Sequence, residues 1–170
     1  MVQPEHDIAL HDTDRLQGRA ALVNNVKAAV SLAGAVRSTL GPRGLDKMLV
    51  GPDGSSLVTN DGVTVLEAAQ IEHPTARLLI AASASQDKVA RDGTTTTVIL
   101  TAELLQNALE MVRSGIHPSI VINGYSIAQK ECLDELESLS KEASSPEDGK
   151  SVVSTSLAGK IGESLAEHLT

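Results

Sequence analysis

Residues 39–62, TLGPRGLDKMLVGPDGSSLVTNDG, decide how the chain is divided into elements. Gly41 and Pro42 end a helix, because glycine adopts the left-handed turn that follows a helix and proline cannot continue one. β-Favouring residues on both sides of a turn at 51–54 then predict a hairpin over residues 47–59. Asn-Asp-Gly at 60–62 is turn chemistry and ends the hairpin. This hairpin is the only convincing β signal in the sequence.

Helical patterns lie on both sides of this segment. Upstream, apolar residues recur every three or four positions from about residue 15 to residue 40 and make one apolar face. Downstream, the spacing and the first-turn prolines predict helices over residues 63–69, 74–90, 94–113, 118–140 and 152–169. Small polar residues at 143–149 predict a linker, with regions 1–142 and 143–170 on its two sides. The expected fold class is therefore mainly α, a helical bundle with one β-hairpin.

Composition excludes several classes of function. The chain has 170 residues and a formal net charge of −8, which disfavours nucleic acid and anionic membranes as partners, because both bind a basic face. Its single aromatic residue, Tyr125, excludes base stacking on single-stranded nucleic acid. Cys132 is the only cysteine, so an intrachain disulfide is impossible. Neither a signal peptide nor a membrane-spanning run is evident, and we expect a soluble cytoplasmic protein.

The most informative candidate site is Asp92-Gly93 followed by threonines at 94–97. Threonine is a mediocre helix former, whereas free backbone N–H groups and hydroxyls at a helix start attract phosphate. Asp92 is suited to hold Mg²⁺, which prefers carboxylate and phosphate oxygens. The alternative is that Asp92 caps the helix and the threonines only pack locally. Asp87 also flanks this helix end, but no histidine-rich metal cluster accompanies the two aspartates.

Two further stretches carry weaker signals. Residues 39–44 combine two glycines with Arg43 and could meet an anion, although by themselves they are a helix stop. Asp61, at the sharp turn after the hairpin, could orient a water molecule toward a phosphoryl group, although Asn-Asp-Gly is also an ordinary tight turn. No Ser/His/Asp or Cys/His arrangement for nucleophilic catalysis is recognisable.

In this order, these stretches resemble the group II chaperonins, the family of the archaeal thermosome and the eukaryotic cytosolic chaperonin. The resemblance extends from about Leu16 to Leu169 and is closest to the archaeal branch. It rests on residues 39–50, 59–62, 92–96 and 115–119. Residues 71–74, 86–87 and 155–160 also resemble the family sequence between these motifs and near the end of the chain.

The resemblance implies an ATP-driven, double-ring folding machine that contains other chaperonin subunits and acts on unfolded client proteins. Each subunit of that family has an equatorial ATP-binding domain, an intermediate domain and an apical domain that handles clients. Residues 1–142 would then be the N-terminal part of the equatorial domain and residues 143–170 the start of the intermediate domain, with the apical domain absent. The hairpin would pair with strands of a neighbouring subunit.

The resemblance also assigns roles to individual residues, with ATP and Mg²⁺ as the cofactors. Asp92 matches the Mg²⁺ ligand, and Asp61 matches an acidic residue near the γ-phosphate and the attacking water. The phosphate cradle of the family is matched by Gly93, Thr94, Thr95 and Thr96. A loop on the other side of the nucleotide is matched by Leu40 and Gly41, and a lysine that senses the γ-phosphate is matched by Lys160.

Two departures from the family pattern bear on function. Arg91 stands where the family usually has glycine, and we expect its guanidinium to turn outward to solvent instead of pairing with Asp92. The chain is also about a third of a family subunit, without the returning equatorial half and its part of the nucleotide site. That leaves open whether this chain hydrolyses ATP, and the alternative is a stand-alone helical interaction module that binds chaperonin subunits without catalysis.

Overall fold

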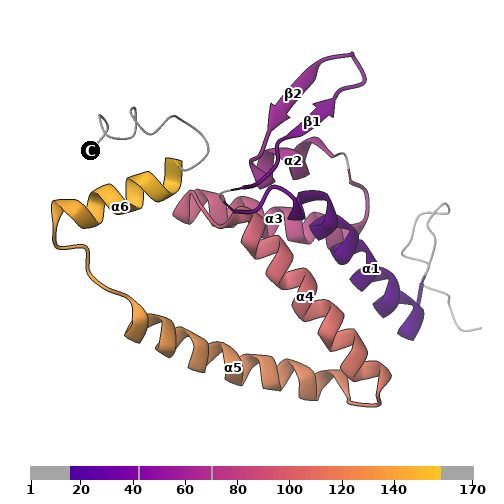
Figure 1. The fold of residues 1–170 in the computed structure, drawn as a ribbon. Coiled ribbons are helices and arrows are strands. Elements are labelled where there is room, and N and C mark those ends of the chain that lie inside the picture. The colour runs from indigo at the N-terminus through magenta and orange to yellow at the C-terminus, as the bar shows by residue number, and fades with distance from the viewer. Residues whose placement is uncertain (1–15, 42, 70, 158–170) are drawn as a thin grey trace, which may run out of the picture.

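The computed structural model describes residues 16–41, 43–69 and 71–157, and within them the fold is mainly α with one antiparallel hairpin, as the sequence predicts (Figure 1). The elements are α1 (Gly18–Arg37), β1 (Lys47–Val50), β2 (Ser56–Thr59), α2 (Gly62–Ala68), α3 (Pro74–Ala90), α4 (Thr94–Arg113), α5 (Pro118–Leu139) and α6 (Pro146–Leu157).

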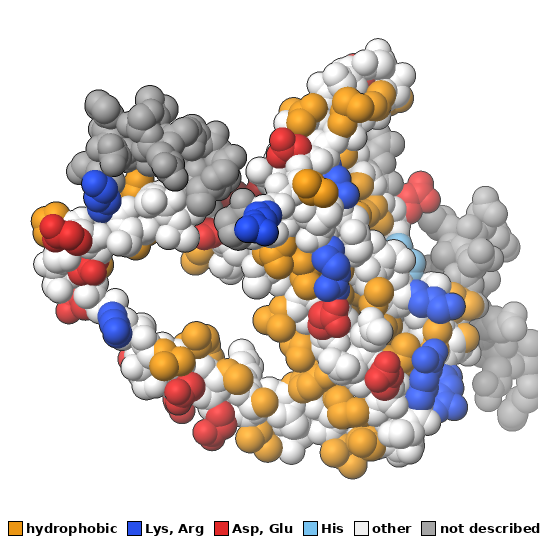
Figure 2. All heavy atoms as spheres, viewed as in Figure 1, with side chains coloured by type: hydrophobic (Ala, Val, Ile, Leu, Met, Phe, Trp, Pro, Cys, Tyr) orange, Lys and Arg blue, Asp and Glu red, His pale blue; other side chains and the backbone are white. Residues whose placement is uncertain are grey.

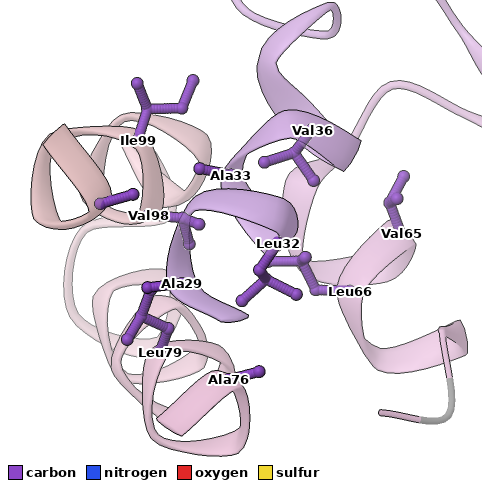
Figure 3. Packing of buried hydrophobic residues seen from close by; sticks show 11 residues of the cluster. Ala29, Leu32, Ala33, Val36, Val65, Leu66, Ala76, Leu79, Val98 and Ile99 are labelled. Atoms are coloured by element: carbon purple, nitrogen blue, oxygen red, sulfur yellow. The ribbon is translucent and has the colours of Figure 1, made fainter. Parts of the chain in front are cut away.

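The core lies where α1, α3 and α4 pack together, with α2 covering one end (Figure 3). Alanines are buried on each of the three long helices, and their small side chains allow the helix backbones to approach closely. Larger aliphatic side chains fill the space around them. The buried members are Ala29, Leu32, Ala33, Val36, Val65, Leu66, Ala76, Leu79, Val98, Ile99 and Ala102. An ion pair between Arg37 and Glu103 also joins α1 to α4.

The hairpin projects from the helices beside α2 (Figure 1). Its register pairs Lys47 with Thr59 and Val50 with Ser56. In the turn, the carboxylate of Asp53 accepts hydrogen bonds from the Ser55 hydroxyl (2.6 Å) and backbone N–H (3.1 Å), which lower the pKa of Asp53. The side chain of Leu49 packs against the core, while the apolar side chains of Met48, Val50, Leu57 and Val58 remain exposed.

The first long helix is shorter than its sequence pattern predicts. α1 ends at Arg37, and not near residue 40, because Thr39 bonds back to Val36 with both its N–H (2.9 Å) and its hydroxyl (2.8 Å). The Leu45 N–H then donates to the Ser38 carbonyl (2.7 Å), which brings the two ends of the loop after α1 together. Gly41 has φ of +85°, the left-handed conformation expected of a glycine after a helix.

The predicted linker at 143–149 is wrong in its second half, because α6 begins at Pro146. Ser145 and Asp148 form a reciprocal cap: the Asp148 carboxylate accepts from the Ser145 N–H (3.1 Å), and the Asp148 N–H donates to the Ser145 hydroxyl oxygen (3.2 Å). The helix predicted over 152–169 is described only to Leu157, and residues 158–170 lie outside the described part.

α5 and α6 diverge from the packed helices, and α5 contacts α4 near their shared corner, where the Tyr125 hydroxyl donates to the Leu104 carbonyl (2.8 Å; Figure 1). Only Val121 is buried on α5. Apolar side chains gather along α4 and α5 on the side that faces the opening between them and α6 (Figure 2). Within the described ranges, no helix combines the length and the apolarity that crossing a membrane requires.

Candidate functional site

The motifs singled out in the sequence meet at one cavity of about 600 Å³. Its lining comes from the loop after α1, the turn before α2, the junction of α3 and α4, and one side of α6. The lining residues are Thr39, Leu40, Gly41, Gly44, Asn60, Asp61, Gly62, Asp87, Arg91, Asp92, Gly93, Thr94, Thr95, Thr96, Ser154, Thr155 and Ser156. The residues to which the family resemblance assigns roles are all among them except Lys160, which lies outside the described residues. Arg43 and Thr97, which belong to the candidate stretches, do not line the cavity.

The start of α4 supplies backbone donors to this cavity. Gly93 is the N-cap residue, with φ of +77°, and no side chain caps the first turn. The first intrahelical bond runs from the Thr97 N–H to the Gly93 carbonyl (2.9 Å), so the N–H groups of residues 94–96 have no acceptor within the helix. These N–H groups lie at the positive end of the helix dipole, an arrangement that binds phosphate.

The four threonines of this turn do not share one role. Thr94, Thr95 and Thr96 line the cavity, and the first two are buried. The Thr97 hydroxyl donates to the Gly93 carbonyl (2.9 Å) and does not line the cavity. The interpretation as local packing is therefore correct for Thr97, whereas the other three threonines border the open space.

Asp92 does not cap α4. Its Oδ1 accepts from the N–H of Gly93 (2.7 Å), immediately before the helix, and the residue is exposed at the cavity. Among the described residues, no three His, Cys, Asp or Glu side chains are grouped closely enough to hold a metal ion. The residues present fit Mg²⁺ in one way: Asp92 would provide one carboxylate, and phosphate oxygens would complete the coordination.

Asp61 has a structural role besides any chemical one. It is the N-cap of α2, and its Oδ2 accepts from the backbone N–H (3.0 Å) and the hydroxyl (2.6 Å) of Thr64. These bonds hold an exposed carboxylate in a defined position on the cavity wall. For its second oxygen, the described residues contain no hydrogen-bond partner.

The two aspartate motifs are joined by a close backbone contact at Gly62. A Cβ atom at Gly62 would clash with the Thr95 hydroxyl and lie 3.3 Å from the Thr95 Cα. The start of α2 therefore rests directly on the first turn of α4. Elsewhere in the lining, a Cβ at Gly44 would clash with the Thr39 carbonyl, so the backbone is closely packed beside Leu40 and Gly41.

The outward orientation expected for Arg91 agrees with the structure. Its side chain is 83% exposed and its guanidinium lies 3.7 Å from the Asp87 carboxylate, with no ion pair to Asp92 within the described residues. Arg91 is also the only non-glycine residue of the described chain with a positive φ, +57°.

Sequence reasoning missed Asp87 and the α6 residues 154–156 as parts of the cavity wall. Asp87 precedes Asp92 by five positions and was set aside as a metal ligand for want of histidines. No local pattern marks residues 154–156 as site residues, because their proximity to the α3–α4 junction arises only from the folding of the chain.

Comparison with known proteins identifies the family of this chain. A sequence model of the TCP-1/cpn60 chaperonin family matches residues 32–170. The chain is 46% identical to a thermosome subunit of Methanocaldococcus jannaschii over 158 residues, which cover 91% of this chain and 29% of that subunit. It is 40% identical to thermosome subunit alpha of Thermoplasma acidophilum, covering 87% of this chain and 27% of that subunit. Thermosome subunit 3 of Haloferax volcanii is 38% identical over 99% of this chain and 33% of its own length.

The chain thus spans about a third or less of the length of these relatives, and it corresponds to their N-terminal part. The family match covers both the loop at 39–44 and the start of α4 that line the cavity. On this evidence the chain belongs to the TCP-1/cpn60 chaperonin family, as the group II motifs in its sequence indicate.

Proposed function

We propose that this chain forms the phosphate- and metal-binding wall of a nucleotide site in an ATP-dependent chaperone subunit. The observation that carries the proposal is the meeting of three separate motifs at one cavity: the loop at 39–44, the turn at 59–62 and the start of α4. Each motif has a structural explanation of its own, but none of those explanations requires the three to meet.

The phosphates of ATP would bind at the first turn of α4. The N–H groups of Thr94, Thr95 and Thr96 donate to phosphate oxygens, and the helix dipole stabilises the negative charge. Gly93 leaves room for close approach, because the only atom within 4 Å of a Cβ at that position would be Nε2 of Gln86, at 3.4 Å. Leu40 and Gly41 would border the nucleotide from the other side of the cavity.

Two carboxylates would act on the phosphates in different ways. Asp92 would hold Mg²⁺, which neutralises phosphate charge when it is bound. Asp61, held in place by Thr64, would orient the water that attacks the γ-phosphate. Lys160 keeps the γ-phosphate-sensing role that the family resemblance gives it.

The partners follow from the same proposal. Other chaperonin subunits would form a ring with this chain through the exposed hairpin. Its strands pair only with each other within the described residues, and they carry exposed apolar side chains. Unfolded proteins would be the clients of the complete assembly, through an apical domain, and the cytoplasm its compartment. Region 1–142 would belong to the equatorial domain and region 143–170 to the intermediate domain.

A stand-alone interaction module is the second candidate function. The observation that favours it is the exposed apolar surface of α5 and the hairpin, which suits binding to another protein and needs no catalysis. In that case the chain would bind chaperonin subunits and would not use ATP.

The test is a chimera in which residues 1–170 replace the matching segment of a thermosome subunit, with nucleotide binding and hydrolysis measured separately. Asp92→Ala should abolish Mg-ATP use, because Mg²⁺ loses its carboxylate. Asp61→Ala should preserve ATP affinity and slow hydrolysis, because positioning of water matters only on the way to the transition state.

Asp134→Ala is the matched control, since Asp134 is exposed on α5 and does not line the cavity. It should leave both measurements unchanged. A chimera that assembles into rings but neither binds nor hydrolyses ATP would overturn the proposal in favour of the interaction module. Loss of binding with an unchanged chemical step in Asp61→Ala would show that the role given to Asp61 is wrong.

A further inference from the structure

Two side chains of α3 hold the turn that carries Asp92. The side-chain amide of Gln86 donates from Nε2 to the Asp92 carbonyl (3.1 Å), and the hydroxyl of Ser83 donates to the Thr94 carbonyl (3.2 Å). Ser83 and Gln86 are three residues apart, so they lie on the same face of the helix. Through these two bonds that face of α3 contacts the start of α4 and the residue Asp92 just before it.

The burial of Ser83 makes its bond a strong constraint. Ser83 is 0% exposed, and a hydroxyl at such a position is costly unless it is hydrogen-bonded. Its only hydrogen bond within the described residues is the one to the Thr94 carbonyl, an oxygen that also belongs to the hydrogen-bond ladder of α4. An apolar residue at position 83 would avoid the free-energy cost of burying a hydroxyl. We therefore interpret the Ser83 hydroxyl as a group that orients the Thr94 carbonyl.

Because the peptide bond is planar, a hydrogen bond to a carbonyl on one side of the turn also orients the N–H group on the other side. A carbonyl and the N–H of the next residue share one plane and point in opposite directions. Gln86 therefore fixes the plane whose N–H, that of Gly93, donates to the Asp92 carboxylate (2.7 Å). Ser83 fixes the plane whose N–H, that of Thr95, lies in the open first turn of α4.

We infer that Gln86 and Ser83 are positioning residues, Gln86 for the Asp92 carboxylate and Ser83 for the Thr95 N–H. The expected effect on nucleotide binding rests on the proposed function. Gln86 should affect the part of the binding that depends on Mg²⁺, and Ser83 the part that does not. Neither side chain lines the cavity, so both act through the backbone of the turn.

The test measures ATP binding to the thermosome chimera by isothermal titration, with and without Mg²⁺, because the 170-residue chain by itself carries only one wall of the proposed site and should bind ATP weakly or not at all. Gln86→Met keeps the length of the side chain and removes the donor; it should weaken Mg-ATP binding about tenfold, while the affinity for Mg²⁺-free ATP changes less than twofold. Ser83→Ala should weaken both affinities by the same factor. The matched controls, Gln106→Met on α4 and Ser85→Ala on α3, change exposed residues outside the cavity and should change neither affinity.

A second measurement judges the positioning without nucleotide. Backbone ¹⁵N order parameters of the 170-residue chain should fall at Gly93 in Gln86→Met and at Thr95 in Ser83→Ala. The fall should run from about 0.85, which is typical of a rigid backbone, toward values below about 0.6, which are typical of a flexible one. Unchanged order parameters in both variants would overturn the inference, as would equal loss of both affinities in Gln86→Met. Absence of any ATP binding by the unsubstituted chimera would instead overturn the proposed function, and the order parameters of the 170-residue chain would still decide the positioning roles.

Discussion

Arg91 adopts a backbone conformation that its side chain disfavours. Its φ of +57° and ψ of 17° lie in the left-handed region, where the Cβ atom of an L-residue is crowded by its own backbone. The residue ends α3 by donating its N–H to the Asp87 carbonyl (2.9 Å), so the fold needs this geometry to turn into Asp92. The side-chain ion pair with Asp87 is highly exposed and contributes only about 0–1 kcal/mol.

Arg91→Gly should therefore stabilise the chain. Relief of left-handed strain gains about 1–2 kcal/mol, and the greater freedom of glycine in the unfolded chain offsets about half of it. Arg91→Ala is the control, because it also removes the ion pair and keeps the Cβ. Urea unfolding should rank Arg91→Gly above Arg91→Ala by about 1 kcal/mol. Equal stabilities would show that the turn does not require a positive φ.

The same substitution bears on the nucleotide site. In the thermosome chimera, Arg91→Gly should change ATP affinity less than tenfold, because the guanidinium is exposed and lies beside Asp87 instead of Asp92. Isothermal titration would measure this directly. A tenfold gain in affinity, about 1.4 kcal/mol, would mean that the arginine obstructs the site.

Asp148 makes the start of α6 sensitive to acid. Its carboxylate accepts from the Ser145 hydroxyl and from the N–H groups of Ser145 and Ser144, and these bonds lower its pKa below the ordinary value of 3.8. A lowered pKa in the folded state means that the cap stabilises α6 fully above about pH 3.8 and is lost as the pH falls through the lower, folded value.

We therefore expect the ¹³Cα shifts of α6 to keep their helical values down to pH 3.8 and to lose them at lower pH. In Asp148→Asn this pH-dependent loss should disappear, while Glu147→Gln, one residue earlier in the same turn, should retain it. A wild-type transition centred above pH 3.8 would contradict this account of the cap.

At the scale of elements, the close contact between α2 and α4 constrains the site. A Cβ at Gly62 cannot be accommodated unless Thr95 moves, and Thr95 is buried. Helix ends marked by glycine or proline were predicted well: α4 begins and ends at the expected residues, and α3 and α5 begin directly after His73 and His117. The end of α1 was predicted about three residues too late, because the last helical turn is replaced by the bonds of Thr39 to Val36 in the loop that follows.

Gly62→Ala should destabilise the chain by about 1–3 kcal/mol, the usual cost of overpacking. Gly34→Ala is the matched control: Gly34 lies inside α1, a Cβ there would meet nothing within 4 Å, and alanine in a helix is more stable than glycine by about 0.5–1 kcal/mol. Thermal unfolding should show opposite shifts for the two variants. Equal shifts would mean that α2 does not rest on α4 at this point.

At the scale of the whole molecule, the most consequential feature is the apolar face that the described chain leaves uncovered. Leu133, Leu136 and Leu139 on α5 are 57%, 62% and 66% exposed. Exposed apolar patches of this kind are typical of surfaces that pack against another protein. The packed helices α1, α3 and α4 do not need α5 for their core.

Replacing Leu133 and Leu136 with glutamine should therefore lower self-association of the 170-residue chain and change its stability by no more than about 0.5 kcal/mol each. Sedimentation velocity would measure the first effect and urea unfolding the second. The control pair, Leu32→Gln and Leu79→Gln, replaces core residues and should unfold the chain. A large loss of stability in the α5 variant would show that its apolar face is already packed.

The sequence by itself determined the fold class, the position of the hairpin and most helix ends, because these depend on local spacing and on the backbone preferences of glycine and proline. It also identified the three motifs, since helix starts and tight turns are local features. Only the tertiary structure decided that those motifs share one cavity and that Asp87 and residues 154–156 belong to its wall. The physical reason is that these properties depend on contacts between segments far apart in the chain, as when Gly62 meets Thr95 or Ser83 bonds to Thr94.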